Sequence, residues 1–434
     1  MRLRLTLLLY NLLLPIGLLI LLPASIVKMR RRGGYGAAFW QRFGSFKAEV
    51  KARLHRGRGK SWWIHAVSVG EVNVARKLIA EILRGEPDRP LVLSVTTSTG
   101  HAVAVKDAPA NLTVIYNPVD FGWIVRSVLR TIQPQKYILM EAELWPNLVR
   151  RAKKRGIPVV LANARLSPRS ERRYRRWRWL AAPLFSMLDR LLVQDESDVE
   201  RWVRIGAPRE RIAVTGSIKY DLAAPVRTER VEEFRLLLQR LWGDPLPPLL
   251  LAASTHAGEE KALASVFMEL RREFPAAVFL LAPRHFERCG EVLAELRSQG
   301  LNVALRSALG DSPQRPDLLL IDSTGELRDW QALAGVVVIG KSFLATGGQN
   351  PAEAIAAGVP VITGPHMGNF QPLMELLRNA GGITEVPSVE MLLPALHRTF
   401  SNLREARAAA ARGREALERH RGAAARTVDI VMAL

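Results

Sequence analysis

Short apolar runs alternate with amphipathic stretches along most of the chain. In the first half, near-continuous apolar runs predict buried strands, and stretches between them, such as Gly122–Thr131 and Leu144–Lys154, have the spacing of helices. This alternation predicts a parallel sheet covered by helices on both faces. The predicted strands are Trp62–Val67, Leu91–Val95, Leu112–Tyr116, Lys136–Met140, Val159–Ala162 and Arg190–Val193.

The same alternation starts again after a charged, proline-containing segment, Leu222–Pro248, which indicates a domain boundary. We therefore predict an α/β protein of two Rossmann-like domains facing one cleft. Residues 33–224 form the predicted N-terminal domain, and residues 225–434, which end in arginine- and alanine-rich helices, form the C-terminal domain. The second set of predicted strands is Leu249–Ala253, Val278–Ala282, Val303–Leu305, Leu318–Ile321, Val336–Ile339 and Val359–Ile362.

The amino terminus carries a long apolar segment. No charged residue occurs from Leu5 to Val27, a length that suits a membrane-spanning helix, while Pro15 and Pro23 leave a shallow interfacial helix open. We predict that residues 1–32 are a membrane anchor with its basic flank. The positive-inside rule then places the rest of the chain on the cytoplasmic side.

The charge balance indicates an anionic partner. The 434 residues carry a formal net charge of +21, which is typical of proteins that bind nucleic acid, phospholipid surfaces or phosphorylated substrates. Two basic stretches, Lys28–Lys60 and Arg165–Trp179, are interleaved with aromatic residues. Next to an apolar anchor, this pattern favours an anionic membrane surface and an amphiphilic ligand over nucleic acid. The lone Cys289 excludes an intramolecular disulfide framework and a cysteine-based zinc site.

A glutamate follows the first predicted strand in the segment WWIHAVSVGE. Ser68, Val69 and Gly70 turn the chain, and Glu71 opens a segment with helical apolar spacing. Ligands of open α/β sheets bind beyond the carboxyl ends of the strands. Positive amide charge at a helix start favours the ionised carboxylate that a general base requires. Glu71 is therefore a candidate base, and an ordinary first-turn helix residue is the alternative.

Two further segments of the first half carry candidate charges. Glu141 and Glu143 follow the strand Lys136–Met140 in MEAELWPN, and the alternation at a turn leaves open which of them faces the cleft. Lys219, in TGSIKYD near the domain boundary, is a cation suited to a departing phosphate, with a surface role as the alternative.

The second half contains a glycine-rich turn, GGQNPAEAIAAGVPVITGPH, Gly347–His366. Its two glycines allow close backbone approach to a ligand, Asn350 is a predicted N-cap, and Pro351 lies in the first helical turn. Free amides at such a helix start form an anion site, and Glu353 can accept hydrogen bonds from ribose hydroxyls. An ordinary capped helix has the same pattern.

Three other turns follow predicted strands of the second half. In STHAGEE, Ser254 or Thr255 is placed to contact phosphate or to cap the next helix. In LAPRHFER, the guanidinium of Arg284 can pair with a phosphate or form a structural ion pair. In DSTGEL, Gly325 frees backbone amides for a base or sugar. The glycine-rich turn Gly347–His366 is not a Walker loop, because it lacks the pattern GxxxxGK[ST].

In combination, these motifs resemble the Kdo transferases, the 3-deoxy-D-manno-octulosonic acid transferases of lipopolysaccharide biosynthesis. The matching strings occur in order from Trp63 to Phe370 and are WIHAVSVGE, TTSTG, ELWPN, ARLS, ASTHAGEE, APRH, GEL and GGQNP followed by GPHMGNF. The resemblance implies the two-domain glycosyltransferase B fold and metal-independent chemistry without a cofactor. It also implies CMP-Kdo as donor and the lipid A precursor lipid IVA as acceptor, at the bacterial inner membrane.

The resemblance also assigns roles to residues of this chain. It places the general base at Glu71 and two transition-state stabilisers at Glu141 and Lys219, although Ser217-Ile218 replaces the usual Asn-Leu before this lysine. The implied CMP-binding residues are Pro283, Arg284, Gly325, Glu326, Leu327, Asn350, Pro351, Ala352 and Glu353. Gln349 replaces a frequent histidine and Ala354 a frequent proline.

The expected activity is inverting transfer of Kdo from CMP-Kdo to lipid IVA, with nucleic acid excluded as a partner. Two alternatives stay open at this point. One is a non-catalytic lipid-binding protein of the same fold at the membrane surface. The other is a different nucleotide-sugar glycosyltransferase or an epimerase.

Overall fold

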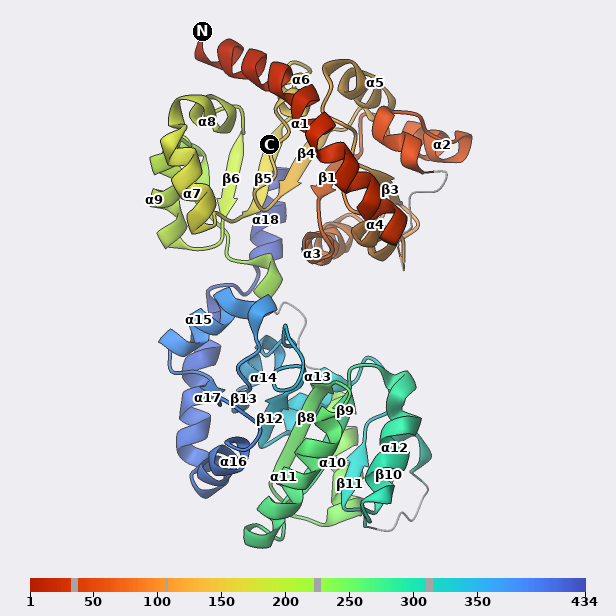
Figure 1. Ribbon diagram of the computed structural model, residues 1–434, viewed down its shortest axis with the longest axis vertical. Helices are drawn as coiled ribbons and strands as arrows, with labels where there is room; N and C mark the ends of the chain where they lie inside the picture. Colours follow the sequence, from red (N-terminus) through yellow and green to blue (C-terminus); the bar gives the residue numbers. More distant parts are fainter. Residues whose placement is uncertain (33–37, 107, 222–227, 310–314) are drawn as a thin grey trace. The chain divides into compact units, whose positions relative to one another are not determined.

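The computed structural model describes residues 1–32, 38–106, 108–221, 228–309 and 315–434 (Figure 1). The chain divides into two compact units. Unit 1 consists of Met1–Asp221 together with Gly422–Leu434, and unit 2 consists of Leu222–Arg421. Each unit contains one seven-stranded sheet in which every pair of neighbouring strands is parallel. This confirms the predicted fold class of two Rossmann-like α/β domains.

The sheet of unit 1 has the strand order β3-β2-β1-β4-β5-β6-β7. The order reverses between β1 and β4, and such a reversal point is where open α/β sheets bind ligands. The strands are β1 (Trp62–Ala66), β2 (Leu91–Val95), β3 (Leu112–Tyr116), β4 (Lys136–Met140), β5 (Val159–Ala164), β6 (Arg190–Val193) and β7 (Ile212–Val214). The connecting helices are α3 (Val69–Gly85), α4 (Ser98–Val105), α5 (Gly122–Ile132), α6 (Pro146–Lys153), α7 (Pro168–Arg176), α8 (Arg178–Phe185) and α9 (Glu196–Ile205).

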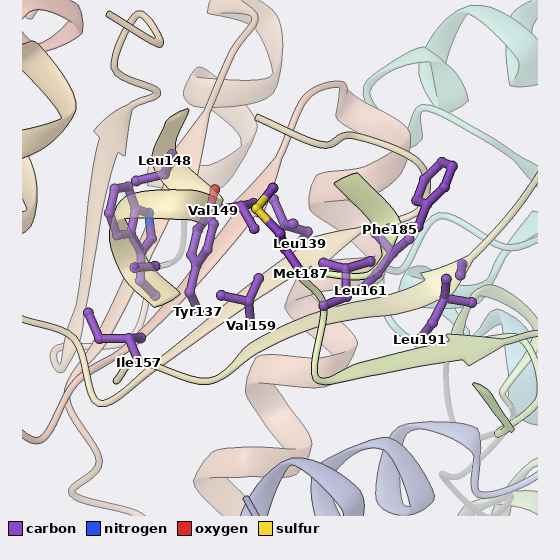
Figure 2. Packing of buried hydrophobic residues seen from close by; sticks show 14 of the residues in the cluster. Tyr137, Leu139, Leu148, Val149, Ile157, Val159, Leu161, Phe185, Met187 and Leu191 are labelled. Carbon is purple, nitrogen blue, oxygen red and sulfur yellow. The ribbon is translucent and has the colours of Figure 1, made fainter. Parts of the chain in front are cut away.

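Both faces of this sheet are covered by buried apolar side chains. On one face, Tyr137 and Leu139 of β4 pack with Leu148 and Val149 of α6, as Figure 2 shows. On the other face, the neighbouring positions Ile138 and Met140 join the apolar residues of α3. Because alternate positions of each strand point to opposite faces, strands that are covered on both faces are apolar throughout. This is why the apolar runs located β1 to β6 of this sheet correctly.

The last helix, α18 (Ala423–Met432), belongs to unit 1, so the predicted C-terminal domain of residues 225–434 is wrong at its end. Ala423, Ala424 and Val431 are buried in the apolar layer that α3 shares with the sheet. The buried ammonium of Lys136 donates to the carbonyls of Val431 and Met432, which lie in the last turn of α18. The apolar face of α18 packs against the layer on the sheet of unit 1. The position of α18 in the sequence, after unit 2, did not indicate this packing.

The sheet of unit 2 has the order β10-β11-β9-β8-β12-β13-β14, which reverses between β8 and β12. Its strands are β8 (Leu249–Thr255), β9 (Val278–Pro283), β10 (Val303–Leu305), β11 (Leu318–Leu320), β12 (Val336–Ile339), β13 (Val361–Thr363) and β14 (Thr384–Glu385). Its helices are α10 (Thr228–Trp242), α11 (Glu259–Glu273), α12 (Cys289–Ser298), α13 (Leu327–Leu333), α14 (Ala352–Ala356), α15 (Gln371–Asn379), α16 (Leu392–Ser401) and α17 (Leu403–Glu418).

Of the boundary segment expected at Leu222–Pro248, residues 222–227 lie outside the described part of the chain. Residues Thr228–Trp242 form α10, whose buried Phe234 stacks on Trp330 of α13 with ring centroids 4.0 Å apart. Two short strands, β7 and β14, were absent from the prediction. β7 is only half-buried and β14 is two residues long, so neither has a continuous apolar run.

The amino-terminal segment is one helix, α1 (Arg2–Arg32), followed by the helix α2 (Ala48–Arg56). One face of α1 packs against α6 and α8, and Thr6 and Leu7 are buried there. Asn11 exchanges hydrogen bonds with Asn147 of α6, at 3.2 and 2.7 Å. The predicted separate anchor of residues 1–32 is therefore, in its first turns, part of unit 1.

Candidate functional site

Glu71 lies in the first turn of α3, directly after β1. The Ser68 hydroxyl accepts a hydrogen bond from the backbone N–H of Glu71 and donates one to Oε1 of the same carboxylate at 3.2 Å. The other oxygen, Oε2, accepts from the backbone N–H of Val67 at 2.8 Å. The sequence Ser-Val-Gly-Glu thus forms a capping box, which holds the carboxylate in one orientation at the end of β1.

The environment of Glu71 opposes ionisation more than the helix start favours it. Burial raises its pKa from 4.5 to about 7, against the hydrogen bonds from Val67 and Ser68. The negative charges of Glu141 and Glu143 raise the pKa further. The expectation that the helix terminus would favour the ionised form was therefore wrong in its net direction. A pKa near neutrality nevertheless suits a general base, which must release its proton after taking it.

Glu141 follows β4, the strand next to β1 at the reversal of the sheet. Its φ angle of 59° is left-handed, a strained conformation for a residue with a side chain and one that is concentrated at functional sites. Burial raises the pKa of Glu141, while the positive charges of Arg165 and Lys219 oppose this shift. The charge of Glu141 thus acts on both Glu71 and Lys219, and the three predicted catalytic residues lie in one unit.

Lys219 lies in the short 3-10 helix η3 (Ile218–Tyr220), which follows β7. The next residue after this helix, Asp221, ends the first of the two chain segments that form unit 1. Burial lowers its pKa, and the carboxylate of Glu141 raises it. Its ammonium lies 5.7 Å from the ring centroid of Tyr220. A partly buried cation beside a carboxylate is suited to binding an anionic group that enters the site.

The loop that carries Glu141 and Glu143 is held by a buried histidine of β1. His65 is fully buried, and burial lowers its pKa to about 3, so that the ring is neutral. Its Nε2 accepts a hydrogen bond from the Trp145 indole at 2.9 Å, and its Nδ1 lies 3.0 Å from the Ser94 hydroxyl. The end of β1 therefore supports two loops: the turn that precedes Glu71 and the loop that carries Glu141 and Glu143.

Two further charged residues belong to this site: Glu143, which the sequence left as an alternative to Glu141, and Arg165, which the sequence placed only in a basic stretch. Burial raises the pKa of Glu143, and its charge acts on Glu71. Arg165 follows β5, and its charge acts on Glu141 and Lys219. The signal for both was their place directly after a strand, since the carboxyl ends of parallel strands meet at one edge of the sheet.

In unit 2, polar groups gather after β8 and β12, again at the reversal of the sheet. The buried carboxylate of Glu259 accepts from the backbone N–H groups of His256 at 3.0 Å and Lys341 at 2.6 Å. His256 Nε2 lies 3.1 Å from Nε2 of Gln349. Ser254 and Lys341 have left-handed φ angles of 58° and 56°. Glu259 thus ties the turn after β8 to the loop after β12; Ser254 lies at an irregularity near the end of β8, and Lys341 lies in that loop.

Thr255 does not point into this group, because its buried hydroxyl donates to Glu260 at 3.1 Å. Pro283 ends β9, and the backbone N–H of Arg284 donates to the carbonyl of Thr255 at 3.0 Å, which leaves the exposed side chain of Arg284 beyond the strand end. The structure therefore brings Pro283 and Arg284 next to the end of β8, as the nucleotide-site prediction requires.

The predicted trio Gly325, Glu326 and Leu327 lies at the start of α13. Gly325 has a φ of 77°, which glycine adopts without strain. The buried carboxylate of Glu326 forms an ion pair with Arg230 of α10 and accepts from the Ser323 hydroxyl. Its side chain therefore serves the packing of unit 2, and backbone groups remain the candidates for ligand contact.

The last predicted group is at α14. The Asn350 side chain accepts from the backbone N–H of Ala352 at 3.1 Å, but the N-cap of α14 is the buried Pro351, so the predicted cap at Asn350 is wrong by one residue. The helix itself is short, Ala352–Ala356, so its dipole is weaker than the predicted helix of residues 351–358 would supply. Glu353 is half-buried in its first turn.

Gly347 and Gly348 serve a purpose different from the one predicted. Their φ angles are 109° and 71°. A Cβ on Gly348 would lie 2.4 Å from the Met367 sulfur, and one on Gly347 would lie 2.5 Å from Nδ2 of Asn369. The two glycines allow this loop to pack closely against the loop after β13, so close packing within unit 2 accounts for them.

Among the residues that the structure describes, no group of three or more His, Cys, Asp or Glu side chains is arranged to hold a metal ion. Cationic side chains lie after strands in both units: Arg165 follows β5 and Lys219 lies in η3 of unit 1, and Arg284 follows β9 and Lys341 follows β12 in unit 2.

Comparisons with known proteins agree with this arrangement. The sequence model of a family described as 3-Deoxy-D-manno-octulosonic-acid transferase (kdotransferase) matches residues 37–222. The 3-deoxy-D-manno-octulosonic acid transferase of Haemophilus influenzae is 32% identical over 85% of this chain and 86% of its own length. The 3-deoxy-D-manno-octulosonic acid transferase of Bordetella pertussis is 35% identical over 93% of each chain.

Among solved structures, UDP-GlcNAc 2-epimerase from Neisseria meningitidis bound to UDP-GlcNAc has a TM-score of 0.52. It is 13% identical and covers 86% of this chain and 100% of that chain. At this identity, the likeness shows the fold alone, which is the glycosyltransferase B fold of two α/β domains.

Proposed function

Since this chain belongs to the family of 3-deoxy-D-manno-octulosonic acid (Kdo) transferases, and is thus a glycosyltransferase of lipopolysaccharide biosynthesis, we propose that Glu71 is its general base. The acidic group at the β1–β4 reversal supports this role, because burial and two neighbouring carboxylates bring the pKa of Glu71 to about 7. A carboxylate with this pKa is ionised in about half of the molecules at neutral pH and can accept a proton from a hydroxyl group.

The proposed reaction transfers Kdo from CMP-Kdo to lipid IVA. Glu71 takes the proton from a glucosamine 6-hydroxyl, and the oxygen forms a bond to the anomeric carbon of Kdo. The bond from that carbon to the phosphate of CMP breaks, and CMP leaves with the electron pair, so the anomeric configuration inverts. Lys219, oriented beside Glu141, stabilises negative charge in the transition state. The proposed chemistry needs neither a metal ion nor a cofactor.

The proposed donor site lies in unit 2. Arg284 and the backbone around Pro283 and Gly325 contact the CMP phosphate and base. Asn350 orients the turn through its hydrogen bond from the Ala352 N–H. From this turn, the carboxylate of Glu353 accepts hydrogen bonds from the ribose hydroxyls. Leu327 and Pro351 border this site, and Glu326 contributes through its backbone, because its carboxylate is paired with Arg230.

We also propose an anionic membrane surface as the second partner of unit 1. Among the described residues, α1 is the one helix that is long and apolar enough to cross a membrane, and Leu8, Leu12 and Leu19 on it are more than 60% exposed. The exposed Trp123 of α5 adds an aromatic group of the kind found at membrane interfaces.

A cluster of arginines on α5, on α6 and directly after α6 also supports an anionic membrane surface as the partner. Burial lowers the pKa of Arg151, and the charges of Arg126 and Arg150 lower it further. Arg155 is affected in the same way by Arg130. Cations that destabilise one another attract anionic headgroups, each contributing about 1 kcal/mol near the surface. The proposed location is the inner membrane, with both units on its cytoplasmic side.

Mass spectrometry of lipid IVA after incubation with CMP-Kdo and the enzyme tests this function. We expect lipid IVA to gain whole Kdo residues while CMP is released. A binding protein would leave the lipid unchanged, and an epimerase would consume the nucleotide sugar in a parallel reaction without lipid. Either outcome would refute the proposal.

A further inference from the structure

The loop that carries Lys219 is held mainly by elements from other parts of the chain. Within Thr215–Asp221, the backbone N–H of Ile218 donates to Oδ1 of Asn163 on β5 at 2.9 Å. The ammonium of Lys77, on the exposed face of α3, donates to the carbonyls of Lys219 at 2.9 Å and Asp221 at 3.0 Å. The carbonyls on both sides of Tyr220 are therefore fixed by a single cation.

The final helix of the chain supplies the other supports. The guanidinium of Arg426 on α18 donates twice to the carbonyl of Thr215, from Nε at 3.0 Å and from Nη2 at 2.7 Å. The buried carboxylate of Asp221 accepts from the backbone N–H groups of Gly422 at 2.9 Å and Ala424 at 2.7 Å. The start of α18 is thus joined to the first residue and to the last residue of the Lys219 loop.

Hydrogen bonds to charged groups are stronger than those between neutral groups, and this set fixes the loop at both its first and its last residue. The loop needs such support, because β7 is half-buried and η3 is a single 3-10 turn. Lys219 is also held between the charges of Glu141 and Arg165, where a small displacement changes its interaction with an anionic ligand.

We infer that α18 and Lys77 position Lys219 for catalysis, with Arg426 and Lys77 as positioning residues that do not themselves contact substrate. This inference rests on the proposed role of Lys219 in Kdo transfer. It gives the carboxyl-terminal helix a part in the chemistry of unit 1, although the sequence places that helix after the whole of unit 2.

The test compares Kdo transfer by the full-length Arg426→Ala, Lys77→Ala and Lys219→Ala enzymes. We expect the first two variants to lose about 10- to 100-fold in kcat, the range for a misplaced catalytic group, with KM for CMP-Kdo within about twofold of wild type. Arg426→Lys should recover part of the loss, because an ammonium can still donate to the Thr215 carbonyl. Lys77 is exposed, so its variant keeps the test valid if Arg426→Ala melts below the assay temperature.

The double variants separate positioning from general destabilisation. If Arg426 acts through Lys219, adding Arg426→Ala or Lys77→Ala to Lys219→Ala causes no further loss. Losses that multiply would overturn the inference, as would single variants within twofold of wild type. Arg412→Ala is the matched control, because Arg412 donates to the carbonyls of Ala380 and Gly381 in unit 2 and should leave kcat unchanged.

The same experiment distinguishes the inference from the proposed function. A wild-type enzyme that does not transfer Kdo would refute the function itself. Full activity in Lys219→Ala, with transfer intact, would remove Lys219 from the chemistry and the positioning role with it, while the function would stand.

Discussion

Glu71 and Ser68 form two hydrogen bonds with each other across the first turn of α3, one through the Glu71 backbone and one through its carboxylate. The two interpretations of Glu71 from the sequence, as a helix-capping residue and as a base, are therefore compatible. The cap holds the carboxylate at the end of β1, and burial raises its pKa to about 7.

Replacing Glu71 with glutamine should abolish most activity while keeping the fold. In Glu71→Gln, the side-chain amide is a poor base, but its oxygen can still accept from the Val67 N–H. We expect kcat to fall about 100-fold or more, the usual contribution of a general base. Glu81→Gln, at the other end of the same helix, is the control, and steady-state kinetics are the measurement. A kcat within a few-fold of wild type would remove Glu71 from this role.

The activity should depend on pH through the same group. Because a base works when ionised, kcat/KM should fall as the pH drops below about 7. Glu143→Gln removes a negative charge that raises the pKa of Glu71, so the acidic limb of the profile should move to lower pH. Glu49→Gln, on the exposed face of α2, should leave the limb in place. An unshifted limb in Glu143→Gln would contradict the coupling.

Stability should depend on pH in the opposite direction from that of an ordinary salt-bridged carboxylate. The pKa of Glu71 is higher in the folded state, so folding binds a proton between about pH 4.5 and about 7. Wild type should lose stability relative to Glu71→Gln as the pH rises through this window, by on the order of 2–3 kcal/mol. Thermal melting of both proteins at several pH values measures the difference. A difference that stays constant with pH would show that the carboxylate is not perturbed.

Most of the fold could be predicted because the sheets are covered on both faces. Strands such as β1 and β4 are buried at every position, and their apolar runs are visible without any structure. The position of α18 could not be predicted, because its small apolar face fits many partners and the residues that hold it, among them Lys136, Thr215 and Asp221, are far away in sequence. The strand β14 has only two residues, too few for a pattern.

Site residues that directly follow strands could be predicted from the sequence. Properties that depend on tertiary contacts, such as burial and ion pairing, could not. The charge of Glu141 acts on Glu71, and the charge of Lys219 acts on Glu141. The direction of the Glu71 pKa shift depends on burial, which a sequence does not give. The ion pair of Glu326 with Arg230 was also invisible, because Arg230 lies in a segment with the composition of a domain boundary.

The nucleotide site can be tested by binding. Glu353→Ala and Arg284→Ala should each weaken CMP affinity by about 1.5–3 kcal/mol, the range for hydrogen bonds to charged groups. Isothermal titration calorimetry with CMP measures this loss. Glu295→Ala, on α12, is a control that should bind CMP normally. Unchanged affinity in both site variants would refute the assignment of the site.

Deleting residues 1–27 should separate membrane binding from catalysis. The truncated protein should still transfer Kdo to detergent-dispersed lipid IVA, but with a lower melting temperature, because Asn147 loses its hydrogen bonds to Asn11. Its residual binding to anionic liposomes should weaken as salt rises, since screening acts over about 8 Å at physiological ionic strength. Flotation at low and high salt measures this. Equal binding at both salts would contradict a basic docking surface.

The return of α18 to the first sheet has a consequence for how the protein is made. Unit 1 is assembled from two stretches of chain, and its last helix leaves the ribosome after all of unit 2 has been synthesised. Because domains generally fold in the order of synthesis, the Lys219 loop waits for its supports until α18 has been synthesised. A nascent or clipped enzyme without α18 would thus carry an apolar gap beside α3, so premature termination would disable the domain whose synthesis begins first.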